Sequence, residues 1–452
     1  MKNILFISDV FLGGGLETRI IEQTKALKKY KIKSFLLCRE INNTYSHNFI
    51  ATSDALTILP SKQNLEAQFV LQDVDTICNF CTENNIDYID CHPFWCALPA
   101  VLAANRLHIP ISFSLHGVLS ANCIVDEYLT AKALYDVIFS YGFNQIFAVA
   151  EYLKGIYPYL LDIEIVRNGI PLNNFTPKSF KNTKKIAIAS RLDEPKTKLI
   201  IDFLPTLYAS KAITQIDIYG DGSHSPNLQS FINTSQMSDK INMCGWSHDF
   251  IKTINDNQYM LVFGMGRVVL EAMRAGVPVG VLGYGGFAGF VNRDNLLDFS
   301  KNNLTSWCES PKSLSTEFKN LFKNPKNYLF TSNQLSIFNT ELIWQKYYNI
   351  IRELSHQNNP IIQTIYNWLL DHPNSNLLND QELFLQCVRL LSDGNHPINP
   401  RLFYSIFQKQ FDEIDTLKHE NETLKAENQK YQQQLYNRIR RKVSHTISKN
   451  RK

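Results

Sequence analysis

The sequence predicts an α/β protein with two consecutive domains of alternating strands and helices, followed by a helical extension. Three observations lead to this prediction. At 452 residues the chain is too long for one ordinary hydrophobic core. Short apolar runs alternate with amphipathic stretches twice over, on either side of a polar, proline-containing segment. From about Gln357 the helical pattern continues and the strand signals stop.

The first domain is expected over residues 1–167, as a doubly wound parallel sheet of the Rossmann-like kind. Amphipathic stretches at 16–30 and 66–84 separate apolar runs of strand length. A turn cluster, Asn168-Gly169-Ile170-Pro171, then opens a polar boundary segment. The expected strands are 3–8, 33–38, 86–91, 109–115, 145–149 and 163–166.

The second domain is expected over residues 184–335, again Rossmann-like. Two such domains in tandem would face each other across a cleft lined by the carboxyl ends of both sets of strands, where ligands bind in this architecture. The expected strands are 185–189, 215–219, 240–244, 259–263 and 278–282.

The C-terminal extension divides into helices over 357–410, a short coiled coil over 411–437 and a basic tail over 438–452. The heptad places Ile414, Asn421, Asn428 and Leu435 at a, and Leu417, Leu424 and Tyr431 at d. It predicts a homo-oligomer, with a single solvated helix as the alternative. The tail has seven Lys or Arg and no acid, with Ile439, Val443 and Ile447 spaced for one helical face. An anionic membrane surface is one interpretation of the tail and disorder the other.

Composition narrows the class of protein. A hydrophobic content of 44% with 19% charged residues is typical of a soluble globular chain, and a net charge of +4 gives no case for nucleic acid. The N-terminus predicts a first strand and no signal peptide, and no apolar window reaches 18 residues. Among nine cysteines, Cys78-x2-Cys81 and Cys91-x4-Cys96 allow a zinc interpretation, but reduced thiols in a cytoplasmic protein are favoured.

A glycine turn, Gly13-Gly14-Gly15, follows the first strand and opens a helix. Glycines allow a phosphate or sugar to approach the backbone, and a helix N-terminus favours negative charge. Thr18 occupies the third glycine position of the dinucleotide fingerprint, so that fingerprint fails. Glu40, at the end of the second strand, could imitate its ribose-binding acid, which leaves a nicotinamide oxidoreductase as a rival.

Two further groups of residues follow strand ends. His116-Gly117 ends the fourth expected strand, where the imidazole could donate to or accept from a sugar hydroxyl; a structural histidine is the alternative. Arg191 and Lys196 lie on the loop that follows the first strand of the second domain. Two cations five residues apart on such a loop can clamp a diphosphate and stabilise a leaving nucleotide without a metal.

The stretch 259–279 reads strand, glycine turn, helix, strand, the unit that presents helix N-terminal amides to a phosphate. Its turn is Gly264-Met265-Gly266, and Glu271 is the only acid of the helix. A lone carboxylate there is typical of a fixed acceptor for a sugar hydroxyl. An ordinary packing unit with Glu271 in solvent is the alternative.

Six motifs in this order resemble the retaining, GT-B-fold glycosyltransferases of family 4, over roughly residues 1–350. They are Gly-Gly-x-Glu at 14–17, His116-Gly117, Asn168-Gly169-Ile170, the 191–196 loop, Tyr219-Gly220-Asp221-Gly222 and the 264–279 segment. The resemblance implies a metal-independent enzyme without a cofactor. It would transfer a sugar from a nucleotide-diphosphate sugar to a growing surface glycan or lipid-linked acceptor.

The resemblance also implies roles for individual residues. Arg191 and Lys196 match the diphosphate pair, and Glu271 matches the ribose-binding glutamate. The turn Gly264, Met265, Gly266 and Arg267 would lie beside the donor sugar and phosphates. Gly14 and Gly15 match the loop that approaches the sugar phosphate. His116 matches the histidine that lines the sugar pocket. Gly245 and Trp246 lie where the nucleobase is contacted, and a helix at 336–356 would cross back onto the first domain.

One position departs from the family pattern. Phe263 stands where the family has the glutamate that bonds the donor sugar, and Arg267 is a candidate substitute. The departure motivates a rival from another class, a catalytically inactive GT-B-like scaffold of a glycan-assembly complex. The only Asp-x-Asp, Asp73-Val74-Asp75, falls within a helical stretch and does not resemble a metal-binding motif at a strand end.

Overall fold

The computed structural model describes residues 1–11, 14–41, 55–58, 66–93, 95–118, 120, 128–160, 162–173, 175–176, 178–305, 311–356 and 358–393, with Thr423 and Lys425. Apart from these two residues, the expected coiled coil and basic tail lie outside the described residues.

The N-terminal domain is built on a seven-stranded parallel sheet in the order β3-β2-β1-β4-β5-β6-β7. The order changes direction between β1 and β4, so the carboxyl ends of these strands flank the switch point where open α/β sheets bind ligands. The strands are β1 Asn3–Phe11, β2 Lys33–Ile41, β3 Ala55–Ile58, β4 Tyr88–Cys91, β5 Ile111–Leu115, β6 Gln145–Ala148 and β7 Ile163–Ile165.

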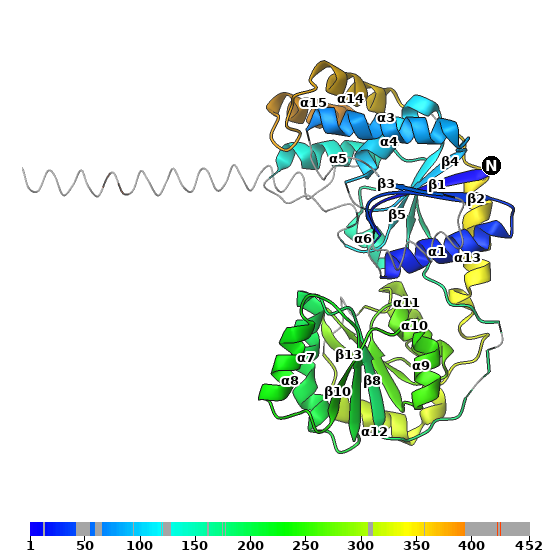
Figure 1. Ribbon diagram of the computed structural model, residues 1–452, viewed down its shortest axis with the longest axis vertical. Coiled ribbons are helices and arrows are strands. Elements are labelled where there is room, and N and C mark those ends of the chain that lie inside the picture. Colours follow the sequence, from blue (N-terminus) through cyan, green and yellow to red (C-terminus); the bar gives the residue numbers. More distant parts are fainter. Residues whose placement is uncertain are drawn as a thin grey trace, which may run out of the picture.

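Helices cover both faces of this sheet (Figure 1). Alternate residues of β1 point to opposite sides: Leu5 and Ile7 pack with the α3–α5 layer, while Ile4 and Phe6 pack with α1. Near-continuous apolar strands result, as expected for a buried parallel sheet. The helices are α1 Gly15–Lys28, α3 Ala67–Glu83, α4 Ala97–Leu107, α5 Leu129–Tyr141 and α6 Tyr152–Ile156.

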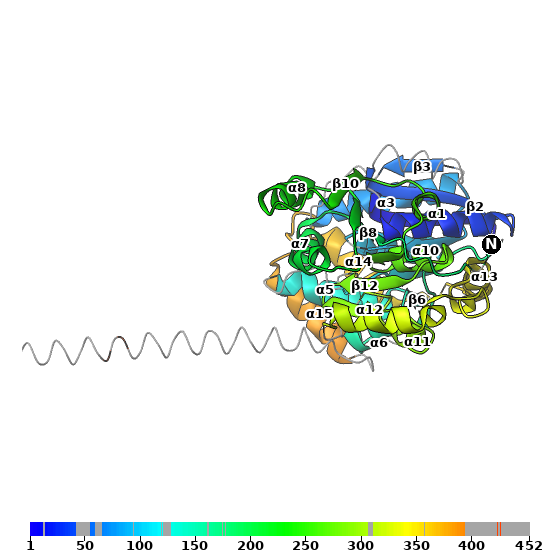
Figure 2. The ribbon, with the colours of Figure 1, turned by 90° about the horizontal axis from the view of Figure 1, so that it is seen from below.

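The C-terminal domain has a six-stranded sheet in the order β10-β9-β8-β11-β12-β13, with its switch point between β8 and β11. Helices α7 and α8 lie on one side of the sheet, and α9 and α10 on the other (Figures 1 and 2). The strands are β8 Lys185–Ala189, β9 Gln215–Tyr219, β10 Ile241–Gly245, β11 Leu261–Gly264, β12 Val279–Gly283 and β13 Gly286–Phe290. The helices are α7 Glu194–Tyr208, α8 Ser225–Thr234, α9 Phe250–Asn257, α10 Arg267–Arg274, α11 Leu296–Lys301 and α12 Leu314–Lys323.

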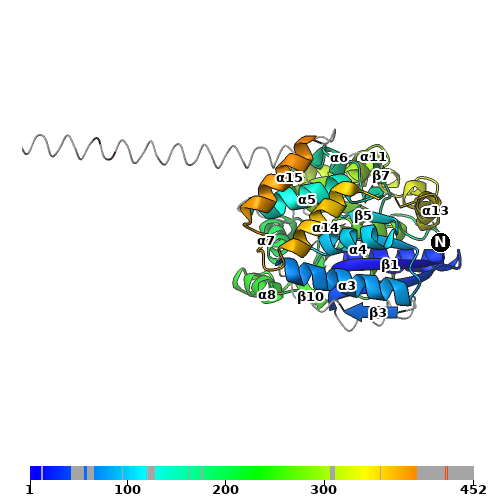
Figure 3. The same cartoon turned by 90° about the horizontal axis from the view of Figure 1, so that it is seen from above.

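The chain then returns to the N-terminal domain. Helix α13 (Thr340–Ile351) packs on α1, with Trp344 and Tyr347 buried in the same core as Ile4 and Phe6. Helices α14 (Pro360–Asp371) and α15 (Gln381–Asp393) lie across α3, α4 and α5 (Figure 3). Ile362, Ile365, Trp368 and Leu369 of α14 join the core of that face. These two helices are therefore part of the N-terminal domain's packing.

The predicted fold class is confirmed: the chain has two Rossmann-like α/β domains with helices at the C-terminal end. Two strands were not predicted. β3 has only four residues, and β13 runs antiparallel at the sheet edge with two glycines in its five residues. Glycine-rich strands carry a weak sequence signal. No helix in the described ranges is long and apolar enough to span a bilayer.

Candidate functional site

The two domains meet at the carboxyl ends of their central strands. Gly14 follows β1 and faces the second domain so closely that a Cβ added to it would lie 3.6 Å from an Arg191 guanidinium nitrogen. A Cβ on Gly15 would lie 4.0 Å from Cδ of Arg267. The first glycine turn therefore lies against both of the second domain's expected arginines, a proximity that the sequence could not show.

The cation pair is organised by a carboxylate. Asp193 caps α7, accepting from the backbone N–H of Lys196 at 3.3 Å and from its Nζ at 2.8 Å. Asp193 also lies 3.3 Å from a guanidinium nitrogen of Arg191. Burial lowers the pKa of Lys196, which the bond to Asp193 partly offsets. The helix N-terminus thus presents two positive groups held on one carboxylate.

Sequence reasoning named Arg191 and Lys196 and missed the function of Asp193. The sequence does contain a signal for Asp193. An Asp directly before a helix commonly caps it by accepting the backbone N–H three residues further on, here that of Lys196. Pro195 in the first helical turn supports the same helix start.

The second glycine turn is sterically constrained. A Cβ on Gly264 would lie 2.4 Å from Cγ1 of Val268 and 3.0 Å from the carbonyl oxygen of Ala189, so any side chain would separate β11 from β8 and α10. Gly266 has a φ of 57° and donates its N–H to the Leu304 carbonyl at 2.9 Å. Met265 between them is partly buried.

Arg267 begins α10 and pairs with a residue of the other domain. Its two terminal nitrogens donate to the two carboxylate oxygens of Glu22 on α1, at 3.0 and 2.7 Å. Glu271, one turn further along α10, lies 3.8 Å from Arg267. Burial raises the pKa of Glu271, against the opposing attraction of Arg267. Glu271 is therefore a mostly buried acid facing a guanidinium and not a solvated surface residue.

Phe263 lies in the core of the second domain. It is fully buried and packs edge-on against Phe203 and Phe287, with ring centroids 5.5 and 5.7 Å away. Its ring also lies over Gly280, where a Cβ would approach it to 2.6 Å. The Phe263 side chain is thus fully used in core packing.

His116 follows β5 at the carboxyl edge of the first sheet, and its Nε2 lies 2.9 Å from Nδ1 of His92, which follows β4. The other nitrogen of His92 lies 3.8 Å from Asp90. Burial lowers the pKa of His92 to about 4 and that of His116 well below its usual value, so both rings are neutral at pH 7.

The expected nucleobase region is an open corner at the end of β10. Gly245 has a φ of 70° and no heavy atom within 4 Å of where its Cβ would be, and its carbonyl accepts the Gly220 N–H at 2.9 Å. Trp246 is 41% exposed. A Cβ on Gly220 would lie 1.9 Å from the Ser190 carbonyl oxygen, so Gly220 allows the β8 and β9 loops to approach.

The residues that allowed a metal interpretation, Cys91 with Cys96 and Asp73 of the Asp-x-Asp, make contacts within the N-terminal domain. The sulfurs of Cys91 and Cys96 are 4.0 Å apart and buried, and burial raises the pKa of both thiols. Asp73 lies on α3 and binds Arg39 at 2.7 Å. Within the described ranges, no group of three His, Cys, Asp or Glu side chains is arranged to hold a metal.

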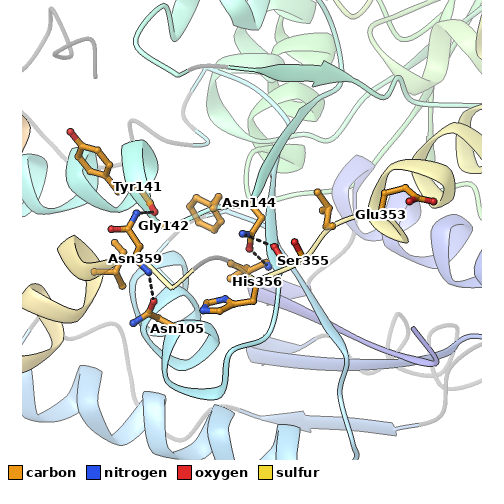
Figure 4. Close-up of a pocket in the computed structure, with 12 residues that line it drawn as sticks. Asn105, Tyr141, Gly142, Asn144, Glu353, Ser355, His356 and Asn359 are labelled. Atoms are coloured by element: carbon orange, nitrogen blue, oxygen red, sulfur yellow. Dashed lines mark hydrogen bonds between the residues drawn. The ribbon is translucent and has the colours of Figure 1, made fainter. Parts of the chain in front are cut away.

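A separate pocket of about 260 Å³ lies at the amino ends of β5 and β6, the opposite edge of the first sheet (Figure 4). The Asn359 side chain donates to the Tyr141 carbonyl at 2.8 Å, and the Asn144 side chain donates to the Ser355 carbonyl at 3.3 Å. These bonds hold the chain leaving α13 onto the N-terminal domain. The residues that line this pocket thus mainly attach the segment after α13 to the N-terminal domain.

Comparison with known proteins places the fold. No protein-family model and no curated protein sequence matches this chain. Among solved structures, Alr3699/HepE from Anabaena in complex with UDP-glucose superposes with a TM-score of 0.60 and 16% identity, over 78% of this chain and 100% of that one. The lipopolysaccharide outer core galactosyltransferase WaaB superposes with a TM-score of 0.54 and 16% identity, over the same shares of the two chains. Sucrose-phosphate synthase from Thermosynechococcus elongatus superposes with a TM-score of 0.58 and 12% identity, over 78% of this chain and 99% of that one. These likenesses establish the GT-B fold.

Proposed function

We propose that this chain is a glycosyltransferase that moves a sugar from a nucleotide-diphosphate sugar to a growing glycan. The observation that carries the proposal is the pair Arg191 and Lys196, gathered by Asp193 at the start of α7 and lying against the Gly14 turn of the other domain. A GT-B fold shared with a UDP-glucose complex supports the same reaction class.

The diphosphate would lie between α7 and the Gly14 turn. Arg191 offers a planar guanidinium and Lys196 a point charge, and both neutralise the charge that develops on the leaving phosphate. A diphosphate would then replace part of their interaction with Asp193. Glu271 would accept from the ribose hydroxyls, and Trp246 would lie beside the base.

Several finer features belong to the same proposal. The reaction would retain the anomeric configuration, need no divalent metal and no cofactor, and serve a capsule, lipopolysaccharide or similar surface glycan on the cytoplasmic side. Acceptor binding would fall to the N-terminal domain. These features rest on the resemblance in sequence motifs.

A non-catalytic scaffold is the second candidate, and Phe263 favours it. The side chain that replaces the family's sugar-binding glutamate is fully buried among aromatic rings and offers a donor no polar group. A scaffold of this kind would keep the fold and lose donor binding.

Calorimetric titration separates the two candidates. We expect the full-length chain to bind UDP or GDP and the corresponding sugars with micromolar to millimolar affinity, as an enzyme that must release its product does. Lack of binding by any of these nucleotides at millimolar concentration would leave the scaffold as the function.

A further inference from the structure

The carboxyl edge of the first sheet contains a row of polar side chains, Asp90, His92 and His116, in which Nε2 of His92 faces the Asp90 carboxylate without a hydrogen bond. Asp90 is fully buried on β4. Its Oδ2 accepts from Gln23 at 2.7 Å and from Tyr347 at 2.6 Å. Its Oδ1 accepts from Ser112 at 3.1 Å and from Ser114 at 3.4 Å. Four donors on two oxygens are the pattern of an ionised carboxylate that acts only as an acceptor.

The carboxylate decides which nitrogen of His92 carries the proton. His92 is fully buried, with Nε2 3.8 Å from Asp90 Oδ1. A lone pair on Nε2 facing a carboxylate would be repulsive in this low-dielectric interior, whereas an N–H is attracted. Because His92 is neutral, a proton on Nε2 leaves Nδ1 with a lone pair.

His116 is the next member of the row. Its Nε2 lies 2.9 Å from the Nδ1 lone pair of His92, so Nε2 must be the protonated, donating nitrogen. The neutral ring then carries its lone pair on Nδ1. No described residue hydrogen bonds this atom, and His116 is only partly buried beside the Gly117 turn.

Burial is the largest effect on the pKa of both rings and lowers it, while the nearby charges act on His92 in opposite directions: Asp90 raises its pKa and Arg19 lowers it. Arg19 on α1 is the cation that acts on both imidazoles, and it disfavours a second proton on either; Asp90 is the anion that acts on His92. Arg19 is itself held by the Arg167 carbonyl at 3.1 Å and lies over the Trp344 ring. Burial, with the contribution of Arg19, thus outweighs the Asp90 charge and keeps both rings neutral.

We infer that His92 is a positioning residue that fixes His116 as a hydrogen-bond acceptor, with the Nδ1 lone pair offered to a ligand at the carboxyl edge of the first sheet. This inference rests on the proposed function only for the identity of that ligand. Its chemistry follows from the lone pair: His116 takes a hydroxyl or amide N–H and rejects a phosphate, a carboxylate or a carbonyl oxygen. A sugar hydroxyl fits and an anionic group does not.

The direct test is the tautomeric state of both rings in the full-length protein, without any substrate. Long-range ¹H–¹⁵N correlation spectra of ¹⁵N-histidine-labelled protein distinguish the two tautomers, and His92→Phe and His116→Gln identify the signals. We expect Nε2–H at both residues and no protonation between pH 8 and pH 5.5. Finding Nδ1–H at His116, or its protonation in that range, would overturn the inference.

His92→Phe tests the positioning role itself. With the partner of Nε2 removed, we expect His116 to populate both tautomers; an unchanged single tautomer would show that His92 does not set it. The spectra do not depend on turnover. If the tautomers are as expected but no nucleotide sugar binds, the proposed function fails and this inference stands; if a nucleotide sugar binds but His116 carries Nδ1–H, the reverse holds.

Discussion

Glu22 and Arg267 join the two domains through a bidentate ion pair, with side chains only 17% and 15% exposed. Arg267 was expected beside the donor sugar, where it was the candidate substitute for the glutamate absent at Phe263. In this structure its terminal nitrogens are held by α1. A donor could use Arg267 only by sharing it with Glu22 or by displacing that carboxylate, so the pair couples the position of the first domain to the site on the second.

Breaking this pair should loosen the domain arrangement. We expect Glu22→Gln to increase the radius of gyration measured by small-angle scattering, because a mostly buried charge pair across the interface is lost. The matched control is Lys29→Gln, at the C-cap of the same helix, which removes an ion pair with Glu341 whose side chains are 65% and 67% exposed. Equal radii for wild type and Glu22→Gln would contradict this coupling.

Placing a glutamate at position 263, as in the glycosyltransferases that the sequence motifs resemble, should fail. Phe263→Glu would put a carboxyl group among Phe203, Phe287 and Phe290, and we expect a loss of about 4 kcal/mol or more, or insoluble protein. Phe263→Leu, the control, keeps the site apolar and should cost about 1–2 kcal/mol. A soluble glutamate variant with an unchanged thermal midpoint would show that this position can face the donor.

The buried histidines predict a loss of stability in mild acid. Burial lowers the pKa of His92 from 6.5 to about 4, so between these values the unfolded chain binds more protons than the folded one. Stability therefore falls as the pH drops through this window, by about 2 kcal/mol from His92 at pH 5, and is unaffected by His92 above about pH 7.

Urea denaturation at pH 7.5, 6 and 5 measures this effect. Carboxylates elsewhere also titrate, so the informative quantity is the difference between wild type and His92→Phe. We expect that difference to shrink as the pH falls, because only the wild type pays the cost of protonating a buried ring. A difference that stays constant with pH would mean that His92 is not buried in its neutral form.

Much of the fold was readable because buried parallel strands are apolar runs and their helices are amphipathic. The strand at 185–189 and that at 215–219 were predicted at their observed bounds. The paired residues were harder to find. Nothing local connects Glu22 with Arg267, and only the three-dimensional structure brings α1 to α10. The sequence around Asp193 is typical of an N-cap, but the hydrogen bond from Lys196 Nζ to its carboxylate depends on side-chain geometry.

The same distinction applies to His116 and Phe263. A histidine at a strand end was identifiable as a candidate, but the direction of its hydrogen bond depends on Asp90, on the neighbouring strand β4, and on His92, which follows that strand. Phe263 ends a continuous apolar run, and such a run does not show which face of a buried sheet each side chain takes. Its packing against Phe203 and Phe287 is visible only in the three-dimensional structure. The roles of the site residues toward a donor stay predictions.

The oligomer and membrane proposals depend on residues outside the described ranges and need their own test. We expect removal of residues 411–452 to reduce the mass measured by multi-angle light scattering to that of a monomer. Removal of 438–452 alone should keep the oligomer and abolish co-sedimentation with vesicles containing anionic lipid. An unchanged mass, or unchanged sedimentation, would remove the corresponding proposal.

Arg191 and Lys196 are proposed to hold the donor's diphosphate, and the rate of donor turnover measures that role. With the nucleotide sugar that binds, we expect Arg191→Ala with Lys196→Ala to lower kcat/KM for hydrolysis or transfer by about 100-fold or more. Lys198→Ala with Lys211→Ala, two exposed cations of the same domain, makes the same change in net charge and should leave turnover unchanged. Wild-type turnover by the Arg191 and Lys196 double variant would show that these two cations do not hold the diphosphate.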